Sequence, residues 1–114
     1  MSHYHDSDDL KLLGEMKTLA PVEFRGFVAL DNVVGRDDGA IPRKYRELIA
    51  LAVACTTQCP YRLDVHSRNA KTAGTTRTEL VETAFITAAL RAGGAVSHGA
   101  LALKLFDQAS GTQR

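Results

Sequence analysis

The sequence lacks most features of secreted, membrane and nucleic-acid-binding proteins. It has no tryptophan, 6% aromatic residues and a net charge of +1, so it has neither a basic field nor stacking aromatics. Its longest nearly apolar stretch, Leu48–Ala54, is much shorter than the roughly 20 residues that span a bilayer. The polar N-terminus has no signal-peptide core, and two cysteines do not make a disulfide scaffold. We therefore expect a cytoplasmic protein without nucleic-acid or membrane partners.

The apolar residues that are present recur with helical spacing, and no segment alternates as a strand does. The 114 residues, 45% of them hydrophobic, suit one domain. Asp8 or Asp9 is placed to cap a first helix, and three prolines, which favour the first turn of a helix, predict three more starts at Pro21, Pro42 and Pro60. We predict an all-α fold of about six helices, with one domain over residues 9–109 between flexible tails at 1–8 and 110–114.

The remaining helix boundaries follow from caps and glycines. The third predicted helix opens at Pro42, and from Tyr45 to about Thr57 it is apolar nearly all round, which is typical of a buried central helix. Thr76 and Glu79 have the spacing of a capping box and predict the start of a fifth helix. The Gly93–Gly94 pair is expected to end that helix, and a sixth would carry the apolar residues from Val96 to Phe106.

One group of residues is suited to chemistry. Cys59 precedes Pro60 at a predicted helix start, where free N–H groups and a partial positive charge stabilise a reactive thiolate. His66 follows seven positions later on the same helical face, with Arg62 between them. Arg62 would lower the pKa of the thiol, and His66 would move protons near neutral pH. Glu47, on the predicted buried helix, needs a partner for its carboxylate, and this cluster is a candidate.

Each of these residues also has a purely structural interpretation. Cys59 alone would be a small buried hydrophobe, and His66 a surface or capping histidine. Glu47 alone would be solvated or paired with Lys44. His3 and His5 are expected to be solvated in the N-terminal tail. Zinc binding by the cysteines with His66 and His98 is not supported by their spacing, so we expect no metal and no cofactor.

The order of these residues resembles the carboxymuconolactone decarboxylase and alkyl hydroperoxidase D superfamily. The family pattern is a Glu, eleven residues, and then C-x-x-C-x-x-x-H, and three positions match it: Glu47, Cys59 and His66. The likeness runs from about Phe24 to Leu105 and includes four flanking segments: Arg46–Val53, Thr56–Tyr61, Ala70–Gly74 and Arg91–Gly99. It implies a single-domain helical array that assembles into homotrimers or homohexamers. In members with both cysteines it also implies peroxidase or disulfide-reductase activity, with Glu and His relaying protons.

The sequence departs from this pattern at the second cysteine, where it has Arg62. The usual C-x-x-C disulfide is therefore excluded, and in many relatives the missing cysteine is the one that attacks peroxide. Cys55 is the other thiol, but Cβ atoms four residues apart in a helix lie about 6 Å from each other, against about 4 Å in a disulfide. A chain break at 58–60 would relieve that mismatch. We expect Cys55 to be a core residue.

Three functions remain open at this point. The favoured one, from the residues around Cys59, is a peroxidase-like redox protein that uses a single thiol on a hydroperoxide and an external thiol reductant. The second is a lyase, in which Arg62 binds a carboxylate of an acidic lactone while Glu47 and His66 exchange protons. The third is a non-catalytic, oligomeric binding module.

Two further residues are expected to assist the site by binding substrate or tuning a pKa. Tyr61 lies beside the motif cysteine, and His98 lies near the start of the sixth predicted helix. His98 would either complete the pocket, across a subunit boundary, or cap its own helix.

Overall fold

A computed structural model describes residues 4–111, so His3 lies outside the described part of the chain. The elements in order are a 3-10 helix and five α-helices: η1 (Ser7–Leu12), α1 (Leu13–Leu19), α2 (Pro21–Val34), α3 (Arg43–Thr57), α4 (Pro60–Thr72) and α5 (Arg77–Gln108). None of the described residues lies in a β-strand. The predicted all-α class is confirmed.

The local signals act as expected at most helix starts. Pro21 and Pro60 occupy the first positions of α2 and α4, and Pro42 is the N-cap of α3. At α5 the Thr76 hydroxyl accepts from the Glu79 N–H at 3.1 Å, and the Glu79 carboxylate accepts from the Thr76 N–H at 2.9 Å. This reciprocal capping box satisfies N–H groups that the first turn leaves free.

The first helical segment starts earlier than predicted. Its N-cap is Asp6, whose side chain accepts from the Asp8 N–H at 3.0 Å, while the Asp9 side chain accepts from the Asp6 N–H at 3.0 Å. Asp6 thus forms a capping box with Asp9, three residues later. Asp8 and Asp9, the predicted N-cap residues, lie inside the first turn, and Asp9 takes part in capping as the third residue of the box.

The predicted break at Gly93–Gly94 does not occur, because α5 continues through it to Gln108. Among the described glycines only Gly74, just after α4, has a positive φ, at 88°. A glycine in the middle of a helix weakens it by roughly 1 kcal/mol but keeps its backbone donor and acceptor, so the ladder continues.

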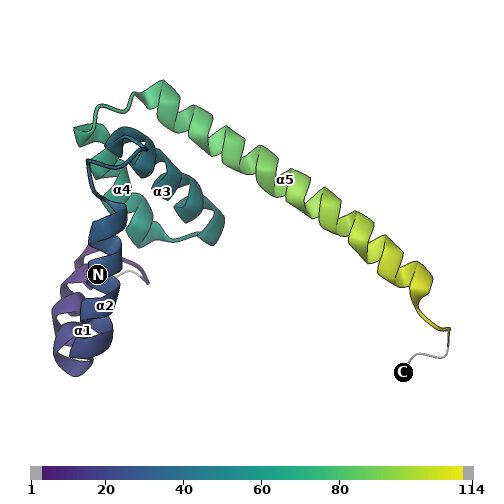
Figure 1. Cartoon of the computed structure of the whole chain (residues 1–114), viewed down its shortest axis with the longest axis horizontal. Helices are drawn as coiled ribbons and strands as arrows, with labels where there is room; N and C mark the ends of the chain where they lie inside the picture. The colour runs from purple at the N-terminus through teal and green to yellow at the C-terminus, as the bar shows by residue number, and fades with distance from the viewer. Residues whose placement is uncertain (1–3, 112–114) are drawn as a thin grey trace.

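The packed part of the protomer is small. Helix α3 packs against α4 and the first half of α5, while the α1–α2 hairpin and the rest of α5 extend away from this unit (Figure 1). The buried apolar residues in the described part are Leu51, Ala54 and Ala70. Contrary to the sequence pattern, α3 is not buried all round, since Ile49 and Val53 are 51% and 54% exposed. No helix in residues 4–111 is both long and apolar enough to cross a membrane.

Candidate functional site

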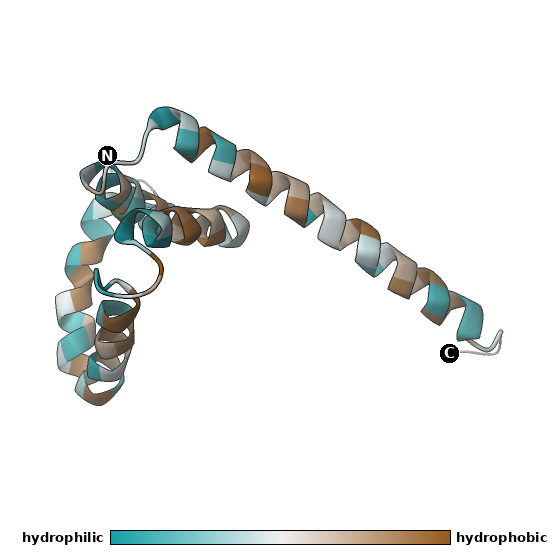
Figure 2. Ribbon diagram, turned by 45° about the horizontal axis from the view of Figure 1, so that its top comes forward, coloured by the Kyte–Doolittle hydropathy of each residue, from teal (hydrophilic) through white to brown (hydrophobic). Residues whose placement is uncertain are grey.

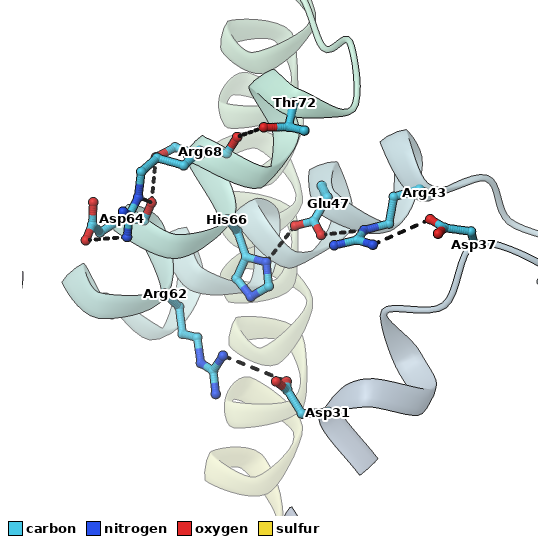
Figure 3. A network of polar contacts seen from close by, with 10 residues as sticks. Asp31, Asp37, Arg43, Glu47, Arg62, Asp64, His66, Arg68 and Thr72 are labelled. Atoms are coloured by element: carbon cyan, nitrogen blue, oxygen red, sulfur yellow. Dashed lines mark hydrogen bonds and ion pairs between the residues drawn. The ribbon is translucent and has the colours of Figure 1, made fainter. Parts of the chain in front are cut away.

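The turn between α3 and α4 brings Glu47 and His66 together. Gln58 adopts a left-handed conformation with φ 55°, and the next N–H, from Cys59, donates back to the Ala54 carbonyl at 3.1 Å. This ends α3 and directs α4 back along it. As a result the His66 Nδ1 lies 2.6 Å from the Glu47 Oε2 (Figure 3).

Glu47 is the most deeply buried charged residue in the described chain, with 3% exposure. Its second oxygen, Oε1, accepts from the Arg43 Nε at 2.9 Å, and this hydrogen bond raises the pKa of Arg43 above its usual value. Arg43 also reaches Asp37, at 3.5 Å. Lys44, an expected partner of Glu47, instead pairs with Glu79 at 2.7 Å. Both Glu47 oxygens are therefore satisfied, as a buried carboxylate requires.

The contact with Glu47 determines the role of each ring nitrogen of His66. Because Nδ1–H donates to the carboxylate, the neutral ring carries its lone pair on Nε2. That nitrogen has no hydrogen-bond partner among the described residues, and the side chain is 20% exposed. His66 is thus a base held in one orientation by a buried carboxylate, the arrangement found in base–orienter pairs of enzymes.

His66 borders a cavity with an apolar and a polar lobe. The apolar lobe, about 480 Å³, has walls from α3 and from the end of α2, including Val34, Ile49, Val53 and Ala54. The polar lobe, about 340 Å³, extends towards Glu47. Six residues border both lobes, namely Asp31, Val34, Arg46, Ala50, Arg62 and His66. A small molecule in either lobe would meet His66.

Arg62 enters the same cavity one turn before His66. Its Nη1 lies 3.8 Å from the Asp31 Oδ1 (Figure 3). Its guanidinium is 5.6 Å from the centre of the Phe27 ring. Both partners of this ion pair are well exposed, at 39% and 47%, so it contributes little to stability. Asp31 therefore holds Arg62 only weakly at the cavity.

Cys59 lies in a different environment from His66. It is the half-buried N-cap of α4, and no hydrogen bond within residues 4–111 joins its thiol to His66 or Glu47. Neither it nor Cys55 borders the two lobes; Cys55 borders a separate surface hollow with His5 and Pro60. The structure therefore brings Glu47, Arg62 and His66 together and leaves Cys59 outside the group.

Tyr61 is linked to the N-terminal segment. Its hydroxyl donates to the Asp9 Oδ2 at 2.7 Å, and this bond raises the pKa of Tyr61 and lowers that of Asp9. His5 makes an edge contact with the Tyr61 ring, 6.2 Å between centroids, so it packs against α4 rather than standing free in a tail.

His98 lies on the projecting part of α5. Its Nδ1–H donates to the Gly94 carbonyl at 3.1 Å, one turn back, and the residue is exposed and outside both lobes. Within residues 4–111 no three His, Cys, Asp or Glu side chains gather as metal ligands.

Sequence reasoning did not identify three residues that shape the cavity. Arg43 was detectable, since it precedes Glu47 by four positions, the spacing of a helical ion pair. Arg46 donates to the carbonyls of Val34 and Ile41, each at 2.8 Å, and so ties the 35–41 loop to α3. Asp31 lies on another helix, and no local pattern pointed to it.

Comparisons with known proteins agree with this architecture. The model of the carboxymuconolactone decarboxylase family matches residues 21–105. A Paracoccus denitrificans protein described as uncharacterized protein 4 in cox locus is 36% identical over 99 residues, covering 87% of this chain and 88% of that protein. The crystal structure of a carboxymuconolactone decarboxylase family protein from Legionella pneumophila superposes with a TM-score of 0.68 at 32% identity and covers 89% of each chain.

Proposed function

The chain belongs to the carboxymuconolactone decarboxylase family, and we propose that it is a lyase that decarboxylates a small acidic lactone at His66. One observation carries this proposal. His66, oriented by Glu47, shares a cavity with the guanidinium of Arg62, and no cysteine borders that cavity. The cavity thus offers a proton-transfer group beside an anion-binding group.

The two lobes suggest how such a substrate would bind. Arg62 would hold a carboxylate that does not react, through the planar pair of N–H donors that suits this anion. The carboxylate that leaves would lie against Ile49 and Val53, where an anion is poorly solvated. Because loss of carbon dioxide removes that charge from the reacting group, an apolar contact there favours the reaction.

The proposed step balances with the protonated form of His66. The bond between the substrate carbon and the leaving carboxylate breaks, carbon dioxide departs, and the electron pair stays on the carbon. That carbon then takes the proton from His66 Nε2, and solvent later reprotonates the ring. Glu47 accepts from Nδ1 throughout, which keeps Nε2 directed at the cavity.

Turnover of carboxymuconolactone, followed by loss of its carboxylate as carbon dioxide, tests this proposal. We expect Arg62→Ala to raise KM strongly, and Arg68→Ala to serve as the matched control. Arg68 lies on the same helix but is exposed and paired with Asp64 at 3.2 Å. Cys59→Ser should remain active. If Cys59→Ser is inactive while Arg62→Ala turns over normally, the lyase proposal is wrong.

A second candidate, thiol redox chemistry, is favoured by the position of Cys59 at the N-terminus of the 13-residue helix α4. The thiolate would attack a hydroperoxide, break the O–O bond, and leave an alcohol and a sulfenic acid. An external thiol would then form a mixed disulfide and release water. Intact mass after treatment with an organic hydroperoxide tests this, because a Cys59-dependent gain of one oxygen is required.

A further inference from the structure

Glu47 lies where the polar start of α3 meets its apolar remainder. Figure 2 shows this change of hydropathy along the helix, and the run Leu48–Cys55, which follows Glu47, has no charged side chain. The residue is nevertheless only 3% exposed. A buried carboxylate needs a partner of opposite charge as well as hydrogen bonds. The cation that meets Glu47 must therefore come from the first turn of α3 or from another helix.

Each basic residue at the start of α3 has its own partner. The Arg43 Nε donates to the Glu47 Oε1 at 2.9 Å. Lys44 instead pairs with Glu79, and Arg46 donates to two backbone carbonyls. Among residues 4–111, Arg43 is therefore the one arginine or lysine within ion-pair distance of the Glu47 carboxylate (Figure 3).

Arg43 also separates Glu47 from the outer surface. It borders the polar lobe of the cavity and, in addition, an outer hollow of about 380 Å³, whereas Glu47 borders the polar lobe and not the hollow. Asp37 lies beyond Arg43, 3.5 Å from its Nη1, and the Asp37 side chain is 82% exposed (Figure 3). Because so exposed a pair contributes little, the contact that fixes Arg43 is the one with Glu47.

The two oxygens of Glu47 have different partners. Oε1 accepts from Arg43, and Oε2 lies 2.6 Å from the His66 Nδ1. An ionised carboxylate can only accept hydrogen bonds, so Nδ1 carries the proton in this contact. A protonated carboxyl group would instead donate to Nδ1, and the proton of the neutral ring would then be on Nε2. The protonation of Glu47 thus determines the tautomer of His66.

We propose that Arg43 is a positioning residue of this site, which keeps Glu47 a hydrogen-bond acceptor and thereby selects the His66 tautomer with its proton on Nδ1. Arg43 acts through Glu47 and does not hold the substrate. A buried carboxylate that loses its cation takes up a proton, so loss of Arg43 moves the proton of the neutral ring to Nε2. The consequence for catalysis rests on the proposed function. The proton donor of that reaction is the ring with protons on both nitrogens, and an accepting Glu47 is what leaves room for the proton on Nδ1.

NMR of the full ¹⁵N-labelled chain tests this assignment without any substrate. Long-range couplings from the carbon-bound ring protons show which ring nitrogen carries a proton, and comparison with His66→Asn assigns the His66 signals. At alkaline pH, where the ring is neutral, we expect the proton on Nδ1 in the native chain. We expect it mainly on Nε2 in Arg43→Met, which keeps a long apolar side chain but no charge. Arg43→Lys restores the charge and should return the proton to Nδ1.

Two matched controls remove charges that the proposal does not use. Asp37→Asn removes the other, exposed partner of Arg43 and should leave the His66 tautomer unchanged. Arg68→Met takes an arginine out of a different helical ion pair, with Asp64, and should leave it unchanged as well. Circular dichroism checks the fold of every variant. If Arg43→Met does not fold, Arg43→Gln replaces it, because it keeps an N–H donor without the charge and should also move the proton to Nε2.

Two results would overturn the role of Arg43. One is a native ring with its proton on Nε2, and the other is a folded Arg43→Met or Arg43→Gln chain that keeps the proton on Nδ1. Lactone kinetics adds a further reading, in which Arg43→Met should lower kcat about 10- to 100-fold and leave KM unchanged. A raised KM at unchanged kcat would also overturn the proposal, because Arg43 would then bind the substrate itself.

The NMR measurement separates this proposal from the proposed function. The expected tautomers in a chain that turns over no lactone would refute the lyase and leave the role of Arg43 standing. Lactone turnover with the same tautomer in the native chain and in Arg43→Met would do the reverse.

Discussion

Helix α4 carries two reactive residues in contrasting surroundings. His66 faces α3, where a buried carboxylate with two partners holds it beside a cavity. Cys59, the N-cap of the same helix, borders neither lobe of the cavity. It lies two positions before Tyr61, which donates a hydrogen bond to Asp9 of the N-terminal segment. Both residues match the family motif, so a match in sequence does not place two residues in one site. The face of the helix that each occupies decides which groups act together.

The largest effect should come from replacing His66, the proton donor of the proposed reaction. We expect His66→Asn to lower kcat on an acidic lactone about 100- to 10,000-fold, since the amide of asparagine does not give up a proton to the substrate carbon. Cys59→Ser should change kcat little. Steady-state kinetics of both variants checks the contrast, and equal losses would show that the two ends of α4 act together.

Removal of the buried carboxylate should have the next largest effect. Glu47→Ala leaves Arg43 and His66 without their shared partner, and we expect a loss of about 3 kcal/mol in the free energy of unfolding. Arg43 is 38% exposed, which keeps the loss at the lower end of the range for buried pairs. Glu82→Ala, on the exposed side of α5, is the control and should change stability by less than about 0.5 kcal/mol. Urea denaturation measures both, and similar stabilities would mean that Glu47 is not structurally paired in solution.

A smaller effect is expected at the other end of α4. Tyr61→Phe removes the hydrogen bond to Asp9, so the N-terminal segment should separate from α4 more often and Cys59 should react faster with iodoacetamide. The lactone kcat should not change. Tyr45→Phe, at a half-exposed tyrosine of α3, is the matched control. An unchanged alkylation rate would show that this segment does not shield the thiol.

The smallest effect concerns the ion pair that joins α3 to the start of α5. Lys44 holds the pKa of Glu79 below its usual 4.5. At pH values between the lowered pKa and 4.5, the folded state therefore binds fewer protons than the unfolded state. The stabilisation is full above pH 4.5 and is lost as the pH falls through the lowered pKa. Glu79→Gln keeps the capping hydrogen bond but not the charge. Its Tm should therefore depend less on pH than that of the unmodified chain between about pH 3 and 6, and parallel curves would contradict this pairing.

The Glu47–His66 pair was predictable because two local features place it. The residues at 58–60 end one helix and start the next, and the spacing to either side returns His66 to the level of Glu47. The role of Arg62 was harder to predict. Its place in the motif suggested a partner for Cys59, but its ion pair is with Asp31 of α2 and its ring contact is with Phe27.

The uninterrupted course of α5 was also not predicted from the sequence. Gly93–Gly94 reads as a break because glycine weakens helices, yet a single helix passes through it. Weak propensity does not end a helix unless a cap or another packing arrangement replaces its hydrogen bonds. The surroundings of that glycine segment could not be predicted from the sequence either, since helical periodicity identifies an apolar face but not the element that packs against it.

The helical class and most helix starts follow from the amino-acid sequence, which also offered the Cys59–His66 group as a candidate partner for Glu47. These features depend on proline geometry, capping side chains and spacings within a few turns, which act through neighbours in the chain. Packing between helices is what places Arg62 against Asp31, ties the 35–41 loop to Arg46 at the cavity, and leaves Cys59 outside the cavity. Those outcomes depend on how α2, α3 and α4 pack, and contacts between distant segments leave no local pattern to read.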